Sequence, residues 1–89
     1  MRAVITVLGT DRVGIIAGVS ATLAESGVNI LDITQTIMKD IFTMIMVVDT
    51  KATSISFEEL DRRLRTKGDE LGLQIRLQRE DIFNSMHRI

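Results

Sequence analysis

A strand gives way to a helix within the segment Val7-Leu8-Gly9-Thr10-Asp11-Arg12-Val13-Gly14-Ile15-Ile16. The β-branched apolar run that leads into this loop, Arg2 to Leu8, has no strongly polar face, which is typical of a central strand. After the loop, apolar residues recur at helical spacing, namely Ile15, Ile16, Val19 and Leu23. Unpaired backbone N–H groups and the positive end of the helix dipole therefore converge at the loop, and such a spot favours a carboxylate or another anion.

The first helix is expected to run from Val13 to Ser26. Asp11 can cap its start, and Gly27 suits the left-handed position just past its end. Gly18 costs roughly 1 kcal/mol relative to Ala inside a helix, so we expect it to permit close packing of the helix on the sheet. Gly14, without a side chain, either lets a ligand approach closely or serves only a tight turn.

The middle of the chain predicts a strand, a turn and a second strand. Val28 to Lys39 alternates between apolar and polar residues, as an edge strand with one wet side would. Lys39-Asp40 is the natural place for a tight reversal, although it lacks the Asn-Gly pair of a strong hairpin turn. Ile41 to Val48 is almost wholly apolar and predicts a second central strand.

A second helix and a last strand follow. Ser56-Phe57-Glu58-Glu59 is a capping box, and the apolar stripe behind it ends near Gly72. Leu73 to Gln78 alternates like a second edge strand. The polar face of the helix is expected to carry i,i+4 ion pairs worth about 0.2–0.5 kcal/mol each, namely Glu58 with Arg62, Glu59 with Arg63, and Asp61 with Arg65.

The element order is therefore βαββαβ, which predicts an α+β domain built as a ferredoxin-like sandwich. The first and third strands should be central in a four-stranded antiparallel sheet. Both helices should lie on one face, because their crossovers have the same hand. The other face is expected to show apolar side chains to water, and a patch of that kind usually marks an interface. Its expected members are Val4 and Leu8, with Phe42, Met44 and Met46 or their neighbours.

Length and composition exclude several classes of function. A chain of 89 residues allows one domain with a thin stability margin, so support from a partner chain is expected. The absence of Cys excludes disulfides, thiolate metal sites and a nucleophilic thiol. Because 11 Lys and Arg balance 12 Asp and Glu, and no basic run stands out, nucleic-acid binding is not expected. Neither a signal peptide nor a bilayer-spanning stretch is recognisable, which predicts a soluble cytoplasmic protein with no membrane contact.

Two motifs resemble those of a known family. The segments Gly-Thr-Asp-Arg-Val-Gly-Ile-Ile at residues 9–16 and Glu-Ser-Gly-Val-Asn-Ile-Leu-Asp-Ile at residues 25–33 resemble the two hallmarks of ACT domains. More narrowly, the chain is similar to the small stand-alone ACT-domain proteins related to the glycine cleavage system transcriptional repressor. The resemblance makes residues 1–80 the ACT domain. Residues 81–89 are left as a tail, either a frayed terminus or a short amphipathic helix that docks on a partner.

The resemblance implies a regulatory module, without enzymatic activity or cofactor, that binds an amino acid or a similar small metabolite at the interface of a homo-oligomer, most simply a dimer. One wall of the site would comprise Asp11, Arg12, Val13, Gly14 and Ile15. The other wall, from a neighbouring protomer, would comprise Asn29, Ile30 and Leu31. Arg12 could pair with an anion and Asn29 could donate and accept hydrogen bonds. Alternatively, Arg12 is only solvated and Asn29 only eases the turn into its strand.

Other functions stay open at the level of the sequence. One is a dimeric interaction module whose apolar sheet face binds a regulated protein partner and whose loop holds no ligand. Another is an acylphosphatase-like hydrolase, in which Arg12 would hold phosphate, but Ile41 to Val48 contains no Asn to orient water. Three sets of residues could be read as catalytic or metal-binding, but simpler structural roles account for them. Asp11 would cap the helix and Asp32 would lie on the strand surface, rather than form a carboxylate pair. His87 would be an exposed residue of the tail rather than a base, and Met44 and Met46 would fill the core or an interface rather than bind a metal.

Overall fold

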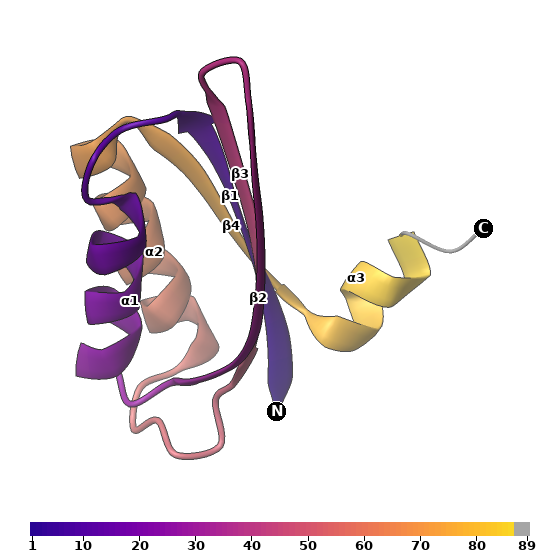
Figure 1. Cartoon of the computed structure of the whole chain (residues 1–89). Coiled ribbons are helices and arrows are strands. Elements are labelled where there is room, and N and C mark those ends of the chain that lie inside the picture. Colours follow the sequence, from indigo (N-terminus) through magenta and orange to yellow (C-terminus); the bar gives the residue numbers. More distant parts are fainter. Residues whose placement is uncertain (87–89) are drawn as a thin grey trace.

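The fold is one antiparallel sheet with two helices on one face (Figure 1). The computed structural model describes residues 1–86. Its sheet has the strand order β2-β3-β1-β4, which confirms that the first and third strands are central. The elements are β1 (Arg2–Thr10), α1 (Ile15–Glu25), β2 (Asn29–Met38), β3 (Ile41–Asp49), α2 (Phe57–Leu71), β4 (Leu73–Arg79) and α3 (Glu80–Met86). The predicted ferredoxin-like architecture is therefore confirmed.

A two-residue turn joins β2 to β3. Lys39 and Asp40 both take left-handed backbone angles, with φ of 52° and 64°. Two such residues in succession form the turn whose twist matches that of the flanking strands. The tight reversal predicted at this position is confirmed, although neither residue is a glycine.

The start of α1 differs from its prediction. The helix begins at Ile15 rather than Val13, and its N-cap is Gly14, with φ of 95° and no side-chain hydrogen bond. Asp11 is therefore not the cap. Its N–H donates to the carbonyl oxygen of Asp40 at 2.7 Å, which ties the loop to the hairpin turn. Gly27 lies past the C-terminus at φ 72°, the left-handed conformation expected of it.

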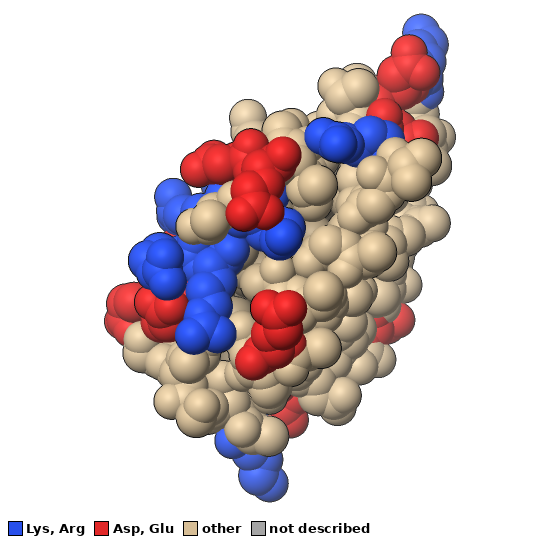
Figure 2. All heavy atoms as spheres, turned by 90° about the vertical axis from the view of Figure 1, so that its left-hand side faces the viewer, with Lys and Arg blue, Asp and Glu red and all other residues tan. Residues whose placement is uncertain are grey.

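Helix α2 is bounded and charged much as predicted. The Ser56 hydroxyl accepts a hydrogen bond from the N–H of Glu59 at 3.0 Å, and Gly72 ends the helix at φ 70°. Glu59 pairs with Arg63 at 2.9 Å and Asp61 with Arg65 at 2.8 Å. Arg62, expected to pair with Glu58, instead reaches Glu59 at 2.6 Å. Figure 2 shows charged side chains crowded over one part of the helix-covered face, beside a broad uncharged part.

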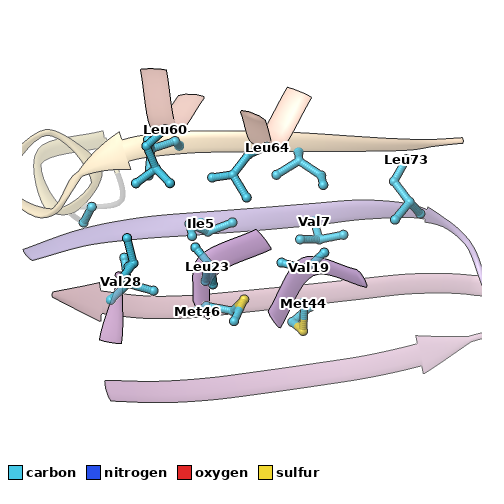
Figure 3. Close-up of a cluster of buried hydrophobic side chains, with 14 of the residues drawn as sticks. Ile5, Val7, Val19, Leu23, Val28, Met44, Met46, Leu60, Leu64 and Leu73 are labelled. Carbon is cyan, nitrogen blue, oxygen red and sulfur yellow. The ribbon is translucent and has the colours of Figure 1, made fainter. Parts of the chain in front are cut away.

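The core lies between the sheet and the two helices (Figure 3). Leu60 and Leu64 of α2 and Val19 and Leu23 of α1 point onto the central strands. Gly18 does not contact the sheet as expected. A Cβ there would lie 3.0 Å from Leu71 Cδ1, so the missing side chain lets α1 approach α2.

On the outer face, the sheet face turned away from α1 and α2, the second of the two alternatives predicted for β3 holds, and the first is wrong. Phe42, Met44 and Met46 are at most 3% exposed, because Met44 and Met46 lie opposite Val7 and Ile5, whose side chains point to the helices. Their neighbours Thr43, Ile45 and Val47 take the outer face instead.

The two β1 residues predicted for the outer face differ from each other. Val4, expected to be exposed, is only 2% exposed because α3 lies against β1 and β4 at that end of the sheet. Leu8, at the other end of the same strand, is 41% exposed as expected. The first seven residues beyond β4 form α3, and the predicted tail beyond Met86, with His87, lies outside the described residues.

Candidate functional site

The loop between β1 and α1 is open to solvent and presents backbone groups. Val13 is 96% exposed, and a Cβ on Gly14 would meet no atom of the described chain within 4 Å. Since Gly14 caps α1 without a side-chain bond, no side chain of the described residues occupies the first-turn N–H groups of the helix. The positive end of the helix dipole is therefore accessible beside the bare Gly14 backbone.

Two charged side chains flank these amides. The Arg12 guanidinium donates through Nη1 to the carbonyl oxygen of Leu71, at the C-terminus of α2, over 3.3 Å. That contact is exposed and long, so most of the donors of Arg12 remain free for an anion. Asp11 is also exposed, and its backbone bond to Asp40 fixes the chain while its carboxylate faces solvent. Ile15, in contrast, is 2% exposed and belongs to the core, where it anchors the start of α1.

The second predicted wall lies at the opposite end of the sheet. Asn29 pairs with Asp49, and Asp49 pairs in turn with Arg2, so Asn29 lies at the end of the sheet where β1 starts. The loop follows Thr10, at the other end of β1. Nine strand residues separate the two ends by about 27 Å. One chain therefore does not bring the two predicted walls together.

The second wall is itself irregular. A β-bulge falls between Ile30 and Asp32, so that Leu31 is left out of the pairing with β3. Ile30 is half-buried and packs against the core, while Leu31 is 47% exposed. The bulge thus turns an apolar side chain outward next to the exposed amide of Asn29.

Strand β2 is a free edge, as predicted. Apart from the half-buried Ile30, every residue of the strand is exposed, including the apolar side chains Ile33 and Ile37 at 40% and 55%. The N–H of Ile33 donates to the Asp32 carboxylate at 2.9 Å. A long edge with exposed apolar residues pairs readily with another strand.

Other chemistry finds little support in residues 1–86. Asp11 and Asp32 do not form a carboxylate pair, because Asp32 lies beside Val47, near the end of the sheet far from the loop. No group of three or more His, Asp or Glu side chains in this range is placed to hold a metal ion. None of the helices in the described range has the length and apolar character needed to cross a membrane.

One hollow in the structure has no counterpart in the sequence analysis. It has a volume of about 730 Å³ and lies beside α3 on the outer face, extending around the edge of β4 to Arg65 and Asp69 of α2. It could not be predicted, because the direction in which α3 leaves β4 decides whether the hollow exists. The residues on its outer-face side are Thr6, Leu8, Ile45, Gln74, Arg76, Gln78 and Phe83.

The family model, a sequence relative and a solved structure give consistent results. The family model described as an ACT domain matches residues 2–78. A UPF0237 protein from Clostridium acetobutylicum is 55% identical over 89 residues, which is 100% of both chains. Among solved structures, an ACT domain protein from Streptococcus pneumoniae has a TM-score of 0.82 at 42% identity and covers 93% of each chain.

Two further solved structures are similar over a part of their own length. A structure assigned as a glycine cleavage system transcriptional repressor has a TM-score of 0.72 at 28% identity, and the match covers 86% of this chain and 44% of that one. The ligand-free regulatory subunit of aspartate kinase from Thermus thermophilus has a TM-score of 0.68 at 26% identity, with 86% and 50% covered. The fold is therefore one that occurs in regulatory proteins.

Proposed function

Because the chain belongs to the ACT-domain family, a family of regulatory modules, we propose that it binds an amino acid or a related small metabolite between two copies of itself. One observation carries the proposal: the loop at residues 11–15 and the strand start at residues 29–31 lie at opposite ends of the same sheet. A site that uses both needs a second copy.

Antiparallel pairing of two β2 strands supplies the required geometry. Met38, at the end of β2, pairs with Ile41, which also pairs with Thr10 directly before the loop. In an antiparallel pair, the start of the partner's β2 lies beside the end of this β2. Asn29 to Leu31 of one copy thus come to the loop of the other, and the two-fold axis creates two identical sites.

The surface beside β2 supports this side as the dimer contact. Within their bounds, α1 and β2 carry one charged residue each, Glu25 and Asp32, whereas α2 is densely charged. The uncharged part of the helix-covered face in Figure 2 is consistent with this division. The exposed Ile16, Ile33 and Ile37 would be buried by a neighbour, and interface cores are poor in charged residues.

The ligand chemistry follows from the two walls. The carboxylate of an amino acid would accept hydrogen bonds from the first-turn amides of α1 beside Gly14, with Arg12 as a second donor. The ammonium group would be held by acceptors, of which the Asp11 carboxylate and the Asn29 amide oxygen are the available side chains. A small apolar part would contact Val13 and the partner's Leu31.

Calorimetry of the purified chain against a panel of amino acids tests this function. Saturable binding is expected for the unmodified chain and is expected to be lost in Gly14→Leu, whose side chain would cover the amides. Gly72→Leu is the matched control. Gly72 also has a positive φ, 70°, and an added Cβ there would likewise meet no described atom within 4 Å. It lies at the C-terminus of α2 and not at the first-turn amides of α1, so it tests the backbone strain of the substitution without covering those amides.

The outcomes separate the candidate functions. Binding that survives Gly14→Leu unchanged would place the ligand elsewhere. Silence across the panel from a chain that still dimerises would favour the interaction module without a ligand. Loss of binding in both glycine variants would point to a general effect of strain, so thermal unfolding of both should be measured in parallel.

A further inference from the structure

Helix α3 covers only one end of the outer face. It follows β4 directly, contacts β1 and β4, and is held at its start by an ion pair between Glu80 and Arg2 at 2.9 Å. Beyond that contact it stands away from the sheet, on the side opposite to α1 and α2 (Figure 1). Within residues 1–86, no other element covers the rest of the outer face.

The uncovered part is apolar in the centre and polar at the β4 edge. Leu8 and Ile45 on the two central strands are 41% and 37% exposed. Gln74 and Arg76 of β4 lie beside Leu8 and Thr6. Together with Phe83 of α3, these side chains line the hollow of about 730 Å³ described above, which we call the outer hollow.

The size of the outer hollow matches a helix like α3. A seven-residue helix is about 10 Å long, and the β4 segment between Gln74 and Gln78 extends about 13 Å. Both residues line the hollow. A single short helix can therefore lie along this wall.

The chemistry also matches. Ile82 of α3 is 47% exposed and has the apolar character that Leu8 and Ile45 would bury. The Arg76 side chain forms no hydrogen bond or ion pair with another residue in the described range, and α3 begins with the acidic pair Glu80-Asp81, whose carboxylates pair with Arg2 and Arg79 in the single copy. The hollow is lined by two arginines, Arg65 and Arg76, and one carboxylate, Asp69, so its net charge is positive and suits an acidic helix.

We propose that the occupant of the outer hollow is α3 of a second copy, and that the exchange is reciprocal. Helix α3 lies at the Val4 end of β1, and the hollow reaches the Leu8 end. A two-fold axis that crosses the strands exchanges these two ends, so each α3 fills the other copy's hollow between two facing sheets. Such a contact is isologous and closes on itself.

The available area suffices for a stable contact. Four strands about 4.8 Å apart and about 30 Å long present roughly 600 Å² in plan. With the side of its own α3 added, each partner presents roughly 700 Å², close to the roughly 800 Å² per partner of a standard interface. This surface lies on the face of the sheet, whereas the proposed ligand-binding dimer uses the β2 edge. With both contacts formed, the chain assembles as a tetramer, a dimer of dimers.

Sedimentation equilibrium of the full chain tests the assembly. Ile82→Asp is expected to halve the mass of the oligomer, because it places a carboxylate in the apolar contact while replacing a side chain that is exposed in the single copy. Asn84→Asp adds the same charge to another exposed position of α3 and is expected to leave the mass unchanged. An identical mass for the unmodified chain and Ile82→Asp overturns the proposal.

Cross-linking gives a second measurement that does not depend on the β2 edge. The chain has no Cys, so a variant with both Ile82→Cys and Gln74→Cys contains only the introduced thiols. Oxidation is expected to yield covalent dimers on a denaturing gel. Covalent monomers with an internal bridge would mean that α3 folds onto its own sheet, and would overturn the proposal, as would the absence of any bridge.

The two proposals fail separately. If calorimetry finds no amino acid but Ile82→Asp halves the mass, the α3 exchange stands and the ligand-binding proposal falls. If Ile82→Asp leaves both the mass and amino-acid binding unchanged, the α3 exchange falls and the ligand site stands.

Discussion

Gly68 is a glycine of α2 at which the helix approaches the sheet closely. A Cβ there would lie 2.8 Å from the backbone carbonyl oxygen of Leu73 and 3.2 Å from Ile75. Because that oxygen belongs to the strand itself, it cannot yield as a side-chain tip would. We expect Gly68→Ala to lower the free energy of unfolding by up to about 2 kcal/mol, since overpacking costs about 1–3 kcal/mol and the preference of Ala over Gly in a helix offsets roughly 1 kcal/mol of it. Urea denaturation at one fixed protein concentration measures this loss.

Gly18→Ala is the matched control, because Gly18 is also a glycine inside a helix. Its added Cβ would lie 3.0 Å from Leu71 Cδ1, the end of a flexible side chain that can turn away. Stability is therefore expected to stay within about 1 kcal/mol of the unmodified chain. Equal losses in the two variants would show that the carbonyl at Leu73 is not what makes position 68 special.

These glycines mark what could be predicted for single residues. A glycine inside a helix indicates that another part of the chain lies close to it, but the sequence does not tell which part. Close packing against the sheet was predicted for Gly18, whereas the structure shows it at Gly68. In the same way, Asp11 precedes the helix as a cap would. Its backbone is instead held by Asp40, a residue 29 positions away whose location only the folded hairpin defines.

At the scale of the element, Glu59 gives α2 its acid sensitivity. Hydrogen bonds from Arg62 and Arg63 lower the pKa of the Glu59 carboxyl from 4.5 to about 2. The folded state therefore binds this proton less tightly than the unfolded state does. The stabilisation is complete above pH 4.5 and is lost as the pH falls from there toward 2.

The variant Glu59→Gln should remove this dependence. We expect it to melt at a lower temperature than the unmodified chain near neutral pH, and the difference to shrink as the pH falls from 4.5 toward 2. Thermal unfolding at a series of pH values is the measurement. Glu58→Gln removes a carboxylate from the same helical turn that forms no ion pair in the described range. If both variants showed the same pH dependence, the arginine contacts of Glu59 would not be its source.

Strands and helices were predicted well where one face is polar, and poorly where both faces are apolar. The capping box and the terminal glycine define α2, and β2 alternates as an edge strand. In Ile41 to Val48 the sequence does not indicate which alternate side chains face the helices, because both sets are mostly apolar and either could be buried. The pairing of Met46 with Ile5 decides it, and that register depends on the position of the hairpin turn.

At the scale of the whole molecule, the sequence predicted which two segments form the candidate site but not where they lie relative to each other. The motifs at residues 9–16 and 25–33 name the walls, and the order of the elements gives the sheet. Only the strand pairing reveals that the walls are separated by the length of a strand. The second copy in the proposed function, which was expected from the family resemblance and from the small size of the domain, is thereby supported by a geometric argument.

A ligand held across two copies must also strengthen their association, because it binds the dimer and not the separate chain. At a free ligand concentration 100 times its Kd, each occupied site should stabilise the dimer by about 2.7 kcal/mol, so the two sites together should lower the dimer dissociation constant roughly 10,000-fold. Sedimentation of Ile82→Asp, in which the β2 edge is the remaining contact, measures that constant with and without the amino acid found by calorimetry. Adding Gly14→Leu should abolish the shift, measured against the ligand-free constant of that same double variant. Saturable binding without any shift would locate the ligand within one copy, and the cleft between copies would then have no part in recognising it.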